Sequence, residues 1–483
     1  MVRSNQSKSQ RSADPMTTST REIFLERMVL SHLILLLIGT TWAYGGNVDW
    51  ARNLVGLWGS LSIPLLFQLS RERLKKRSYL PRVLFTLWPL VIFNGLILFS
   101  LFSPGFRVGY YEGEALLINN LVSPYLPSSA QPLVSLHALW IFDAIYLSCF
   151  NLQLGIKSRH SFRLLLFACS INAIALAVFG TLQKLVHSEG LYFGLKASPQ
   201  PKFFSTFIYH NHWGAFTTLM VTLGLGLVFH YIRRVEGAAI LKTPAVLVGT
   251  SVIFLAISVP LSASRSSSLM VAGLLATALV HWISLILKRY RRRHASASKP
   301  IGIAATVLLI VLGASYILAK PVIHERLDET KEQLAASNSL SGFGSRPILY
   351  RDTLSMAGDR ILFGWGMGSY PVVFPLYNSS DVSPVDGLPM FFHDAHSDWL
   401  QSVAEVGIIG TVLLGLCALV PLWHFRQTLF RSAISNYLLG GCGLILLYAW
   451  LEFPFGNTAV VITFWTAFFT ALSYGRIEAN RTG

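Results

Sequence analysis

The sequence carries little charge for its length. Only 13% of its 483 residues are Asp, Glu, Lys or Arg, against about a quarter in soluble proteins, whereas 53% are hydrophobic and the mean hydropathy is +0.52. Acidic residues are the scarcer kind, with 23 against 39 Lys and Arg, a formal net charge of +16. These shortages exclude a cytosolic enzyme and a disordered basic tail protein. They leave a polytopic membrane protein or a nucleic-acid binder with an apolar core.

Cysteine is also sparse, and its spacing carries no metal or disulfide pattern. The four cysteines lie far apart inside apolar runs, without a C-x-x-C pair, at Cys149, Cys169, Cys417 and Cys442. Such isolated thiols behave as small apolar side chains. We therefore predict packing roles for all four.

What the sequence has in abundance is long apolar runs. Crossing a hydrocarbon core as a helix takes about 20 residues. Twelve runs approach or reach this length, at 29–45, 53–69, 83–102, 135–153, 164–184, 212–231, 244–262, 268–287, 301–319, 399–423, 436–452 and 457–474. The sequence thus predicts an all-α polytopic membrane protein with about 12 transmembrane helices.

The distribution of Lys and Arg selects the membrane protein over the nucleic-acid binder. With both termini placed in the cytoplasm, 27 of the 39 Lys and Arg but only 6 of the 23 acids fall on the cytoplasmic side. That side then carries +21 and the rest of the chain −5, as the positive-inside rule expects. A large outer loop, 320–398, lies between the ninth and tenth spans, with predicted helical patches at Pro321–Ala336 and Pro347–Met356. Loops of this length usually serve a function.

Arginines at the outer boundary are candidates for anion binding. Arg265 follows Ser264 within a run of small hydroxyl residues, 262–268. This suits a phosphate group, because guanidinium binds phosphate oxygens with two parallel N–H groups; an arginine near lipid headgroups is the alternative. Arg346 and Arg351, at the start of the predicted helix in the large loop, can grip an anion together or form a solvated face.

The segment before the tenth span is the candidate catalytic centre. Histidine can accept a proton from a hydroxyl, since its unperturbed pKa lies near neutrality. His396 and His393 are both candidates, and Asp394 or Asp398 can orient the imidazole. No spacing here matches a zinc pattern. Glu405, about two helical turns after Asp398, is predicted to be a structural anchor in the span.

Two further motifs read as local structure. Asn211, in the sequence Tyr-His-Asn-His-Trp at the start of the sixth span, is predicted to cap that helix. The Gly-rich segment 364–368 is predicted to be a turn and not a nucleotide loop, because no Gly-Lys-Ser/Thr follows it.

Taken in order, these motifs resemble the O-antigen ligase and polymerase superfamily of bacterial membrane glycosyltransferases. The similarity covers roughly residues 200–420, and its most specific motif is His-Ser-Asp-Trp-Leu-Gln-x-x-x-Glu-x-Gly at 396–407. The other matching features are an aromatic-Asn-His entry to a span, Ser-x-Ser-Arg at 262–265, Arg346 with an aromatic residue four positions later, and Gly-x-Gly-x-Gly-x-Tyr-x-x-x-x-Pro at 364–375. Two positions depart from the pattern: Ser397, where Asn is commoner, and the extra His393.

The resemblance implies a bacterial inner-membrane enzyme whose active site faces the periplasm. It would transfer a glycan from undecaprenyl diphosphate to a sugar hydroxyl of lipid A–core or another glycan acceptor. His396 would be the general base, with Asp398 and His393 nearby, and Arg265 and Arg346 would hold the diphosphate, assisted by Ser264 and Arg351. Asn211 and Glu405 would line the site. No cofactor, metal or nucleic acid is implied.

The expected organisation has four parts. Residues 1–28 form a disordered cytoplasmic tail, 29–199 the N-terminal membrane helices with an outer loop at 103–134, 200–420 the catalytic region, and 421–483 the C-terminal helices. A polymerase of the same superfamily, or a ligase acting on a protein or another cell-wall polymer, would share this organisation and differ in acceptor. A solute transporter is the alternative from another class, although Asp143 is the only acid near the middle of a predicted span.

Overall fold

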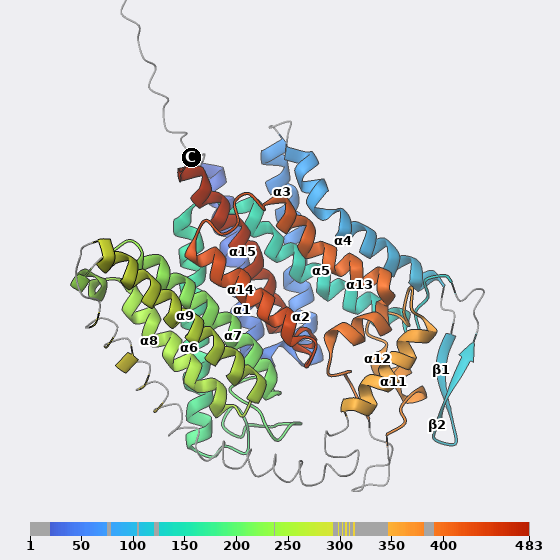
Figure 1. The fold of residues 1–483 in the computed structure, drawn as a ribbon. Coiled ribbons are helices and arrows are strands. Elements are labelled where there is room, and N and C mark those ends of the chain that lie inside the picture. Colours follow the sequence, from blue (N-terminus) through green and yellow to red (C-terminus); the bar gives the residue numbers. More distant parts are fainter. Residues whose placement is uncertain are drawn as a thin grey trace, which may run out of the picture.

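Apolar helices make up most of the structure, which is a computed structural model (Figure 1). It describes residues 20–74, 79–103, 106–119, 125–235, 237–292, 346–380 and 391–482, and the single residues 298, 302, 305, 306, 309 and 313. The long helices are α1 (Thr20–Trp42), α4 (Tyr79–Phe102), α5 (Pro132–Gly155), α6 (Arg159–Leu185), α7 (His210–Ile232), α8 (Pro244–Leu261), α9 (Arg265–Arg292), α13 (Asp398–His424) and α15 (Thr458–Thr482). Shorter helices are α2 (Asp49–Ser60), α3 (Ser62–Leu74), α11 (Arg346–Asp359), α12 (Tyr370–Val373) and α14 (Ala433–Tyr448).

Within the described residues, ten helices are long and apolar enough to cross a membrane, α2 and α3 counting together as one. With the shorter apolar helix α14, they overlap eleven of the twelve predicted runs, which confirms a polytopic helical architecture. The remaining run, 301–319, and the patch Pro321–Ala336 lie outside the described residues. Most boundaries differ from the prediction by a few residues, and two of these differences matter for the tail and the site. Helix α1 begins at Thr20, so residues 20–28 are helical, and α14 ends at Tyr448, so 449–452 belong to a connection.

Successive helices alternate in direction, so their connections gather at two ends of the bundle (Figure 1). At the first, the basic end, Glu478 of α15 pairs with Arg159 at 2.9 Å and Arg234 at 3.2 Å, and Lys157 pairs with Glu22 at 2.6 Å. The second is the site end, where α1, α6, α8 and α14 finish and α2, α7, α9, α13 and α15 begin. Arg159, Arg234 and Lys157, which the sequence assigns to the cytoplasmic side, therefore lie at the same end of the bundle.

Helix α7 occupies the centre and is almost wholly buried, as is α15. Small residues allow its neighbours to come close. A Cβ added to Gly214 of α7 would lie 2.2 Å from the Ser267 Oγ of α9, and one added to Gly441 of α14 would lie 2.4 Å from the Thr222 Oγ1 of α7. Small residues serve this purpose in membrane helices because association there depends on close packing. The four cysteines are buried and free, as predicted.

A smaller group of elements stands at the site end beside α13 (lower right of Figure 1). Helix α11 confirms the helix predicted at Pro347–Met356, and it packs with α12 and the 3-10 turn η5 (Phe374–Leu376) around an apolar core. The fully buried members of that core include Met356, Trp365 and Tyr370. Within the predicted loop 103–134, strands β1 (Phe106–Tyr111) and β2 (Glu114–Asn119) form an antiparallel hairpin.

The remaining elements are short. Two-residue strands β3 (Gly190–Leu191) and β4 (Lys196–Ala197) pair between α6 and α7. Three 3-10 turns complete the connections, η1 (Tyr44–Gly46), η2 (Gly237–Lys242) and η6 (Pro454–Gly456). Both η1 and η6 lie at the site end.

The Gly-rich segment 364–368 forms a turn, as predicted, and it lies against a break in α13. Its three glycines have positive φ, and so does Gly407, where α13 departs from helical geometry. A Cβ on Gly364 would lie 2.3 Å from the carbonyl carbon of Glu405, and one on Gly407 would lie 2.2 Å from the Leu362 carbonyl oxygen. Four backbone hydrogen bonds of 2.8–3.2 Å join the two segments. Two motifs some forty residues apart therefore form one contact.

This contact predicts a stability difference between two glycines of α13. Gly407→Ala places a Cβ at a positive φ and against backbone, so we expect it to destabilise the protein by about 1–3 kcal/mol. Gly415→Ala is the matched control, since a Cβ there meets nothing within 4 Å and alanine favours a helix. Thermal unfolding in detergent, followed by tryptophan fluorescence, measures both variants. Equal melting temperatures for the two would contradict the contact.

Candidate active site

Three distant segments of the chain meet at one buried carboxylate at the site end. Glu452 lies in the connection between α14 and α15, and its side chain is only 3% exposed. Arg346, the first residue of α11, donates from Nη2 to Glu452 Oε1. His396, just before α13, places Nδ1 3.6 Å from Glu452 Oε2. We call Glu452, Arg346 and His396 the Glu452 cluster.

Arg346 and His396 together keep the carboxylate ionised. Burial on its own would raise the pKa of Glu452, but the polar interaction with His396 and the positive charge of Arg346 outweigh burial, so its pKa lies below the ordinary value. Burial likewise opposes charge on Arg346, and Glu452 reverses that effect and raises the pKa of Arg346. The cluster therefore holds a negative charge where the membrane bundle ends.

His396 is fixed on several sides. Its backbone has a positive φ of 51°, an uncommon conformation for a residue with a side chain. Tyr350 of α11 donates from its hydroxyl to the His396 carbonyl oxygen at 2.9 Å. The ring of Phe453 meets the imidazole edge to face, with centroids 4.8 Å apart. The next residue, Ser397, caps α13. With its side chain 29% exposed, the imidazole remains accessible to a substrate.

A chain of hydrogen bonds joins the start of α9 to the cluster. The Ser264 hydroxyl donates to Asn211 Oδ1 at 2.7 Å, Asn211 Nδ2 donates to the Tyr209 hydroxyl at 2.8 Å, and that hydroxyl donates to Glu452 Oε2 at 3.4 Å. The prediction that Asn211 caps α7 is wrong, because Tyr209 is the capping residue and the Asn211 amide bridges two side chains. Arg265 follows Ser264 as the first residue of α9 and is exposed.

The structure places Asp398 and His393, the two residues predicted beside the base, in different surroundings. The Asp398 carboxylate accepts from the Phe455 N–H at 2.9 Å, and its own N–H donates to the Glu452 carbonyl oxygen at 3.3 Å. His393 is exposed and packs edge to face on Phe391. In the parts of the chain that the structure describes, no three His, Cys, Asp or Glu side chains are grouped so as to hold a metal ion.

Glu452 was not singled out from the sequence. The predicted run 436–452 made it the last residue of a membrane helix, at the outer end of the eleventh span, whereas α14 ends at Tyr448 and leaves Glu452 in the connection. An acidic residue at the end of an apolar run, followed by the Phe-Pro-Phe-Gly sequence of a turn, is the signal that was available. Asp398 is hydrogen-bonded to the backbone of Glu452 and Phe455, so it holds the connection between α14 and α15 without contacting the Glu452 carboxylate.

The structure places Arg351 and Arg346 in different surroundings. Arg351 Nε donates to Asp352 Oδ1 at 3.1 Å, and Nη2 donates to the Ser379 hydroxyl. Its side chain is 66% exposed. Arg346 alone of the two belongs to the Glu452 cluster.

Glu405 lies in the contact between α13 and the glycine turn. Its carboxylate accepts from the backbone N–H of Gly368 at 2.7 Å and of Tyr370 at 3.2 Å. Gln401 links it onward, since Nε2 donates to Glu405 at 3.2 Å while Oε1 accepts from the Ala395 N–H at 3.0 Å. Because Ala395 precedes His396, Glu405 connects the turn to the backbone beside the imidazole.

Comparison with known proteins identifies the region that carries these residues. Residues 250–415 match the family model described as O-Antigen ligase. This region belongs to the O-antigen ligase family. It runs from within α8 to within α13 and contains Arg265, Arg346 and His396, so the chain is a membrane enzyme of the O-antigen ligase or polymerase type. Asn211 and Glu452 lie outside the O-antigen ligase-family region, and no curated protein matches the chain at a significant level.

The Glu452 cluster predicts a pH-dependent term in stability. Because the folded pKa of Glu452 lies below its ordinary value of 4.5, its contribution is present above that value and is lost as the pH falls through the folded pKa. We expect Glu452→Gln to remove this loss at acidic pH and to destabilise the protein at neutral pH by about 1–3 kcal/mol, because Arg346 is left without its carboxylate.

The measurement is the melting temperature from about pH 3 to pH 7 for wild type and variant. Glu189→Gln is the control, since Glu189 is exposed and lies in the connection between α6 and α7. An acid-side slope unchanged in Glu452→Gln, or flattened equally in Glu189→Gln, would argue against the ionised carboxylate.

Proposed function

We propose that this protein transfers a glycan from undecaprenyl diphosphate to an acceptor sugar hydroxyl at the periplasmic face of the bacterial inner membrane, as an O-antigen ligase. The observation that carries this proposal is the Glu452 cluster, in which a histidine and an arginine of the family region face one buried carboxylate. The cluster lies opposite the basic end, and basic ends of membrane proteins face the cytoplasm. This supports the periplasmic assignment.

The proposed reaction is a displacement at the sugar carbon attached to the diphosphate. The acceptor hydroxyl oxygen forms a new bond to that carbon, while the bond from the carbon to the phosphate oxygen breaks. The bonding electrons leave with undecaprenyl diphosphate, and the hydroxyl proton passes to the enzyme. Attack from the face opposite the leaving group inverts the configuration of the carbon.

His396 is the proposed proton acceptor, and the Glu452 carboxylate is proposed to orient its imidazole ring. With Nδ1 3.6 Å from the Glu452 carboxylate, the favoured neutral tautomer carries its proton on Nδ1 and leaves Nε2 as the base. After proton transfer, the carboxylate also stabilises the imidazolium, as an orienting acid does in hydrolases with a histidine base. Tyr350 and Phe453 restrict the backbone and the ring so that little reorganisation is needed.

Arg346 and Arg265 are proposed to meet the charge of the diphosphate. Arg346 donates to Glu452 from one nitrogen, and its side chain is 43% exposed, so other N–H groups of its guanidinium can contact phosphate oxygens. Arg265 opens α9, a helix of 28 residues whose N-terminal N–H groups also favour an anion. Fixed cations then stabilise the leaving group, which is the role that metal ions fill in much phosphoryl chemistry. We accordingly propose a mechanism without a metal.

A polymerase of lipid-linked glycans would use the same donor and the same base, and it would differ only in its acceptor. The description of the matched family favours the ligase. The same match makes solute transport the weaker candidate.

The histidine pair supplies the first functional prediction. We expect His396→Ala to lower glycan transfer by about 10²–10⁴-fold, because general base catalysis contributes that much. His393→Ala is the matched control, three residues away and exposed, and it should retain transfer within a few-fold. The assay uses purified protein in proteoliposomes with a lipid-linked glycan donor. Full activity of His396→Ala, or loss in His393→Ala alone, would move the base to His393.

The arginines supply the second. Arg346→Ala and Arg265→Ala should each lower the transfer rate by about 10²-fold, because each removes a charged contact to the leaving group. Arg351→Ala, in the same helix as Arg346 but bonded to Asp352 and Ser379, should stay near the wild-type rate. Rates are measured with saturating acceptor and varied donor, with and without a chelator. Equal losses in all three variants, or loss of activity on chelation, would oppose the proposed arginine clamp.

A further inference from the structure

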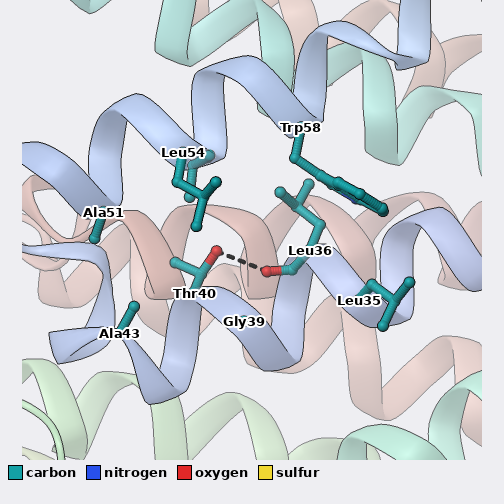
Figure 2. A pocket seen from close by; sticks show the side chains of 9 residues that line it. Leu35, Leu36, Gly39, Thr40, Ala43, Ala51, Leu54 and Trp58 are labelled. Carbon is teal, nitrogen blue, oxygen red and sulfur yellow. Dashed lines mark hydrogen bonds between the residues drawn. The ribbon is translucent and has the colours of Figure 1, made fainter.

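A groove open to the hydrocarbon region runs between α1 and α2. It encloses about 230 Å³, and its lining includes Leu35, Gly39, Ala43, Ala51, Leu54 and Trp58 (Figure 2). The one hydroxyl in the lining belongs to Thr40, and it donates to the Leu36 carbonyl oxygen of its own helix at 2.6 Å. The wall is therefore apolar throughout.

Small residues open the groove, and large residues form its edges. A Cβ added to Gly39 would meet nothing within 4 Å. Ala51 and Val55 are buried on the α2 side, whereas Leu35 and Leu54 are each more than half exposed. The groove thus has a buried floor and exposed apolar edges, as expected of a surface that contacts a hydrocarbon chain. From Leu35 to Ala43 it extends about 12 Å along α1.

The end of the groove near Ala43 adjoins the site end of the bundle. A Cβ on Gly46 would lie 2.6 Å from Thr40 Cγ2 and 2.8 Å from Thr458 Cβ, so these three residues are in direct contact. The Thr458 hydroxyl also donates to the Gly46 carbonyl oxygen at 2.9 Å. Thr458 begins α15, six positions after Glu452. These small residues therefore link the groove wall to the start of α15, which follows the connection that carries Glu452.

A cationic side chain, Arg52, lies beside the end of the groove that adjoins the site end. Arg52 follows Ala51 in the first turn of α2, and its Nη2 donates to Asn47 Oδ1 at 3.1 Å. Its charge reaches the loop before α13: burial raises the pKa of Asp394, and interactions with His393, His396 and the Arg52 guanidinium offset part of that rise. Next to it, Tyr44 and Trp50 form an aromatic pair of the kind found where a membrane meets water.

We propose that the groove between α1 and α2 holds the part of the isoprenoid chain nearest the phosphates of the lipid diphosphate donor, with Arg52 at the level of those phosphates. This inference rests on the proposed function, which requires such a donor. The groove has a volume of about 230 Å³ and is lined by the small residues Gly39, Ala43 and Ala51, so it suits a segment of one chain, whereas a phospholipid carries two acyl chains and lipid A several. An apolar channel below and a cation above match a lipid with one tail and an anionic head.

Filling the groove tests the inference. Gly39→Phe places a ring in the channel, and Gly95→Phe in α4 is the matched control, because Gly95 is also an exposed helical glycine with nothing within 4 Å of its Cβ position. We expect Gly39→Phe to raise the KM for the undecaprenyl donor about tenfold, since apolar contact along the chain is lost. Transfer from a donor with a single isoprene unit, which is too short to reach Gly39 from the level of Arg52, should stay at the wild-type level. Gly95→Phe should behave as wild type with both donors.

A binding measurement separates this inference from the proposed function. Native mass spectrometry measures how much undecaprenyl phosphate the purified protein retains, and we expect less in Gly39→Phe and in Arg52→Gln. Retention of undecaprenol, which has no charge, should fall only in Gly39→Phe. Wild-type protein that retains undecaprenyl phosphate but transfers no glycan would refute the proposed function and support the groove. The inference would be overturned if Gly39→Phe left both the retention of undecaprenyl phosphate and the KM for the donor unchanged. It would also be overturned if added phospholipid alone displaced undecaprenyl phosphate from the wild-type protein.

Discussion

The site depends on one buried negative charge that needs charged and polar partners. Glu452 is withdrawn from solvent at the end of the membrane bundle, where an unpaired carboxylate would be costly. Arg346 supplies one partner and His396 the other, from α11 and from the loop before α13. Because each partner comes from a different segment, the pairing fixes three segments relative to each other. The same interaction that stabilises the charge also orients the imidazole and holds the arginine.

Close packing of the helices next to the Glu452 cluster fixes the positions of the residues around it. Helix α7 brings Tyr209 and Asn211 to the site end, and its close approach to α9 through Gly214 sets the position of Ser264 and Arg265. On the other side, the break in α13 at Gly407 accepts the glycine turn, and Glu405 receives the N–H groups of that turn. The loop before α13 is thereby attached to both a membrane helix and the outer group of elements, which supports a preorganised catalytic residue.

Basic, apolar and polar regions follow one another along the axis of the bundle. Basic residues gather at one end of the bundle, and the polar cluster occupies the opposite end. Between them the surface is apolar, and the groove of α1 and α2 rises through it to meet Arg52 and the Glu452 connection. A lipid-linked glycan has the same sequence of properties, with an apolar chain, a charged diphosphate and a polar sugar. Matching levels would place the reacting bond near His396 without a separate recognition domain.

The sequence by itself determined the helices, the charge distribution and the family, since apolar length, basic loops and short motifs are local properties of the chain. It also indicated the turn at 364–368 and the packing role of the cysteines. Only the tertiary structure identified Glu452 and Arg52, made Asn211 a bridge and not a cap, and assigned Arg351 to different partners from Arg346. These outcomes depend on where α14 ends and on contacts between residues that lie tens to hundreds of positions apart. Such contacts arise from packing of the whole bundle, which no local pattern encodes.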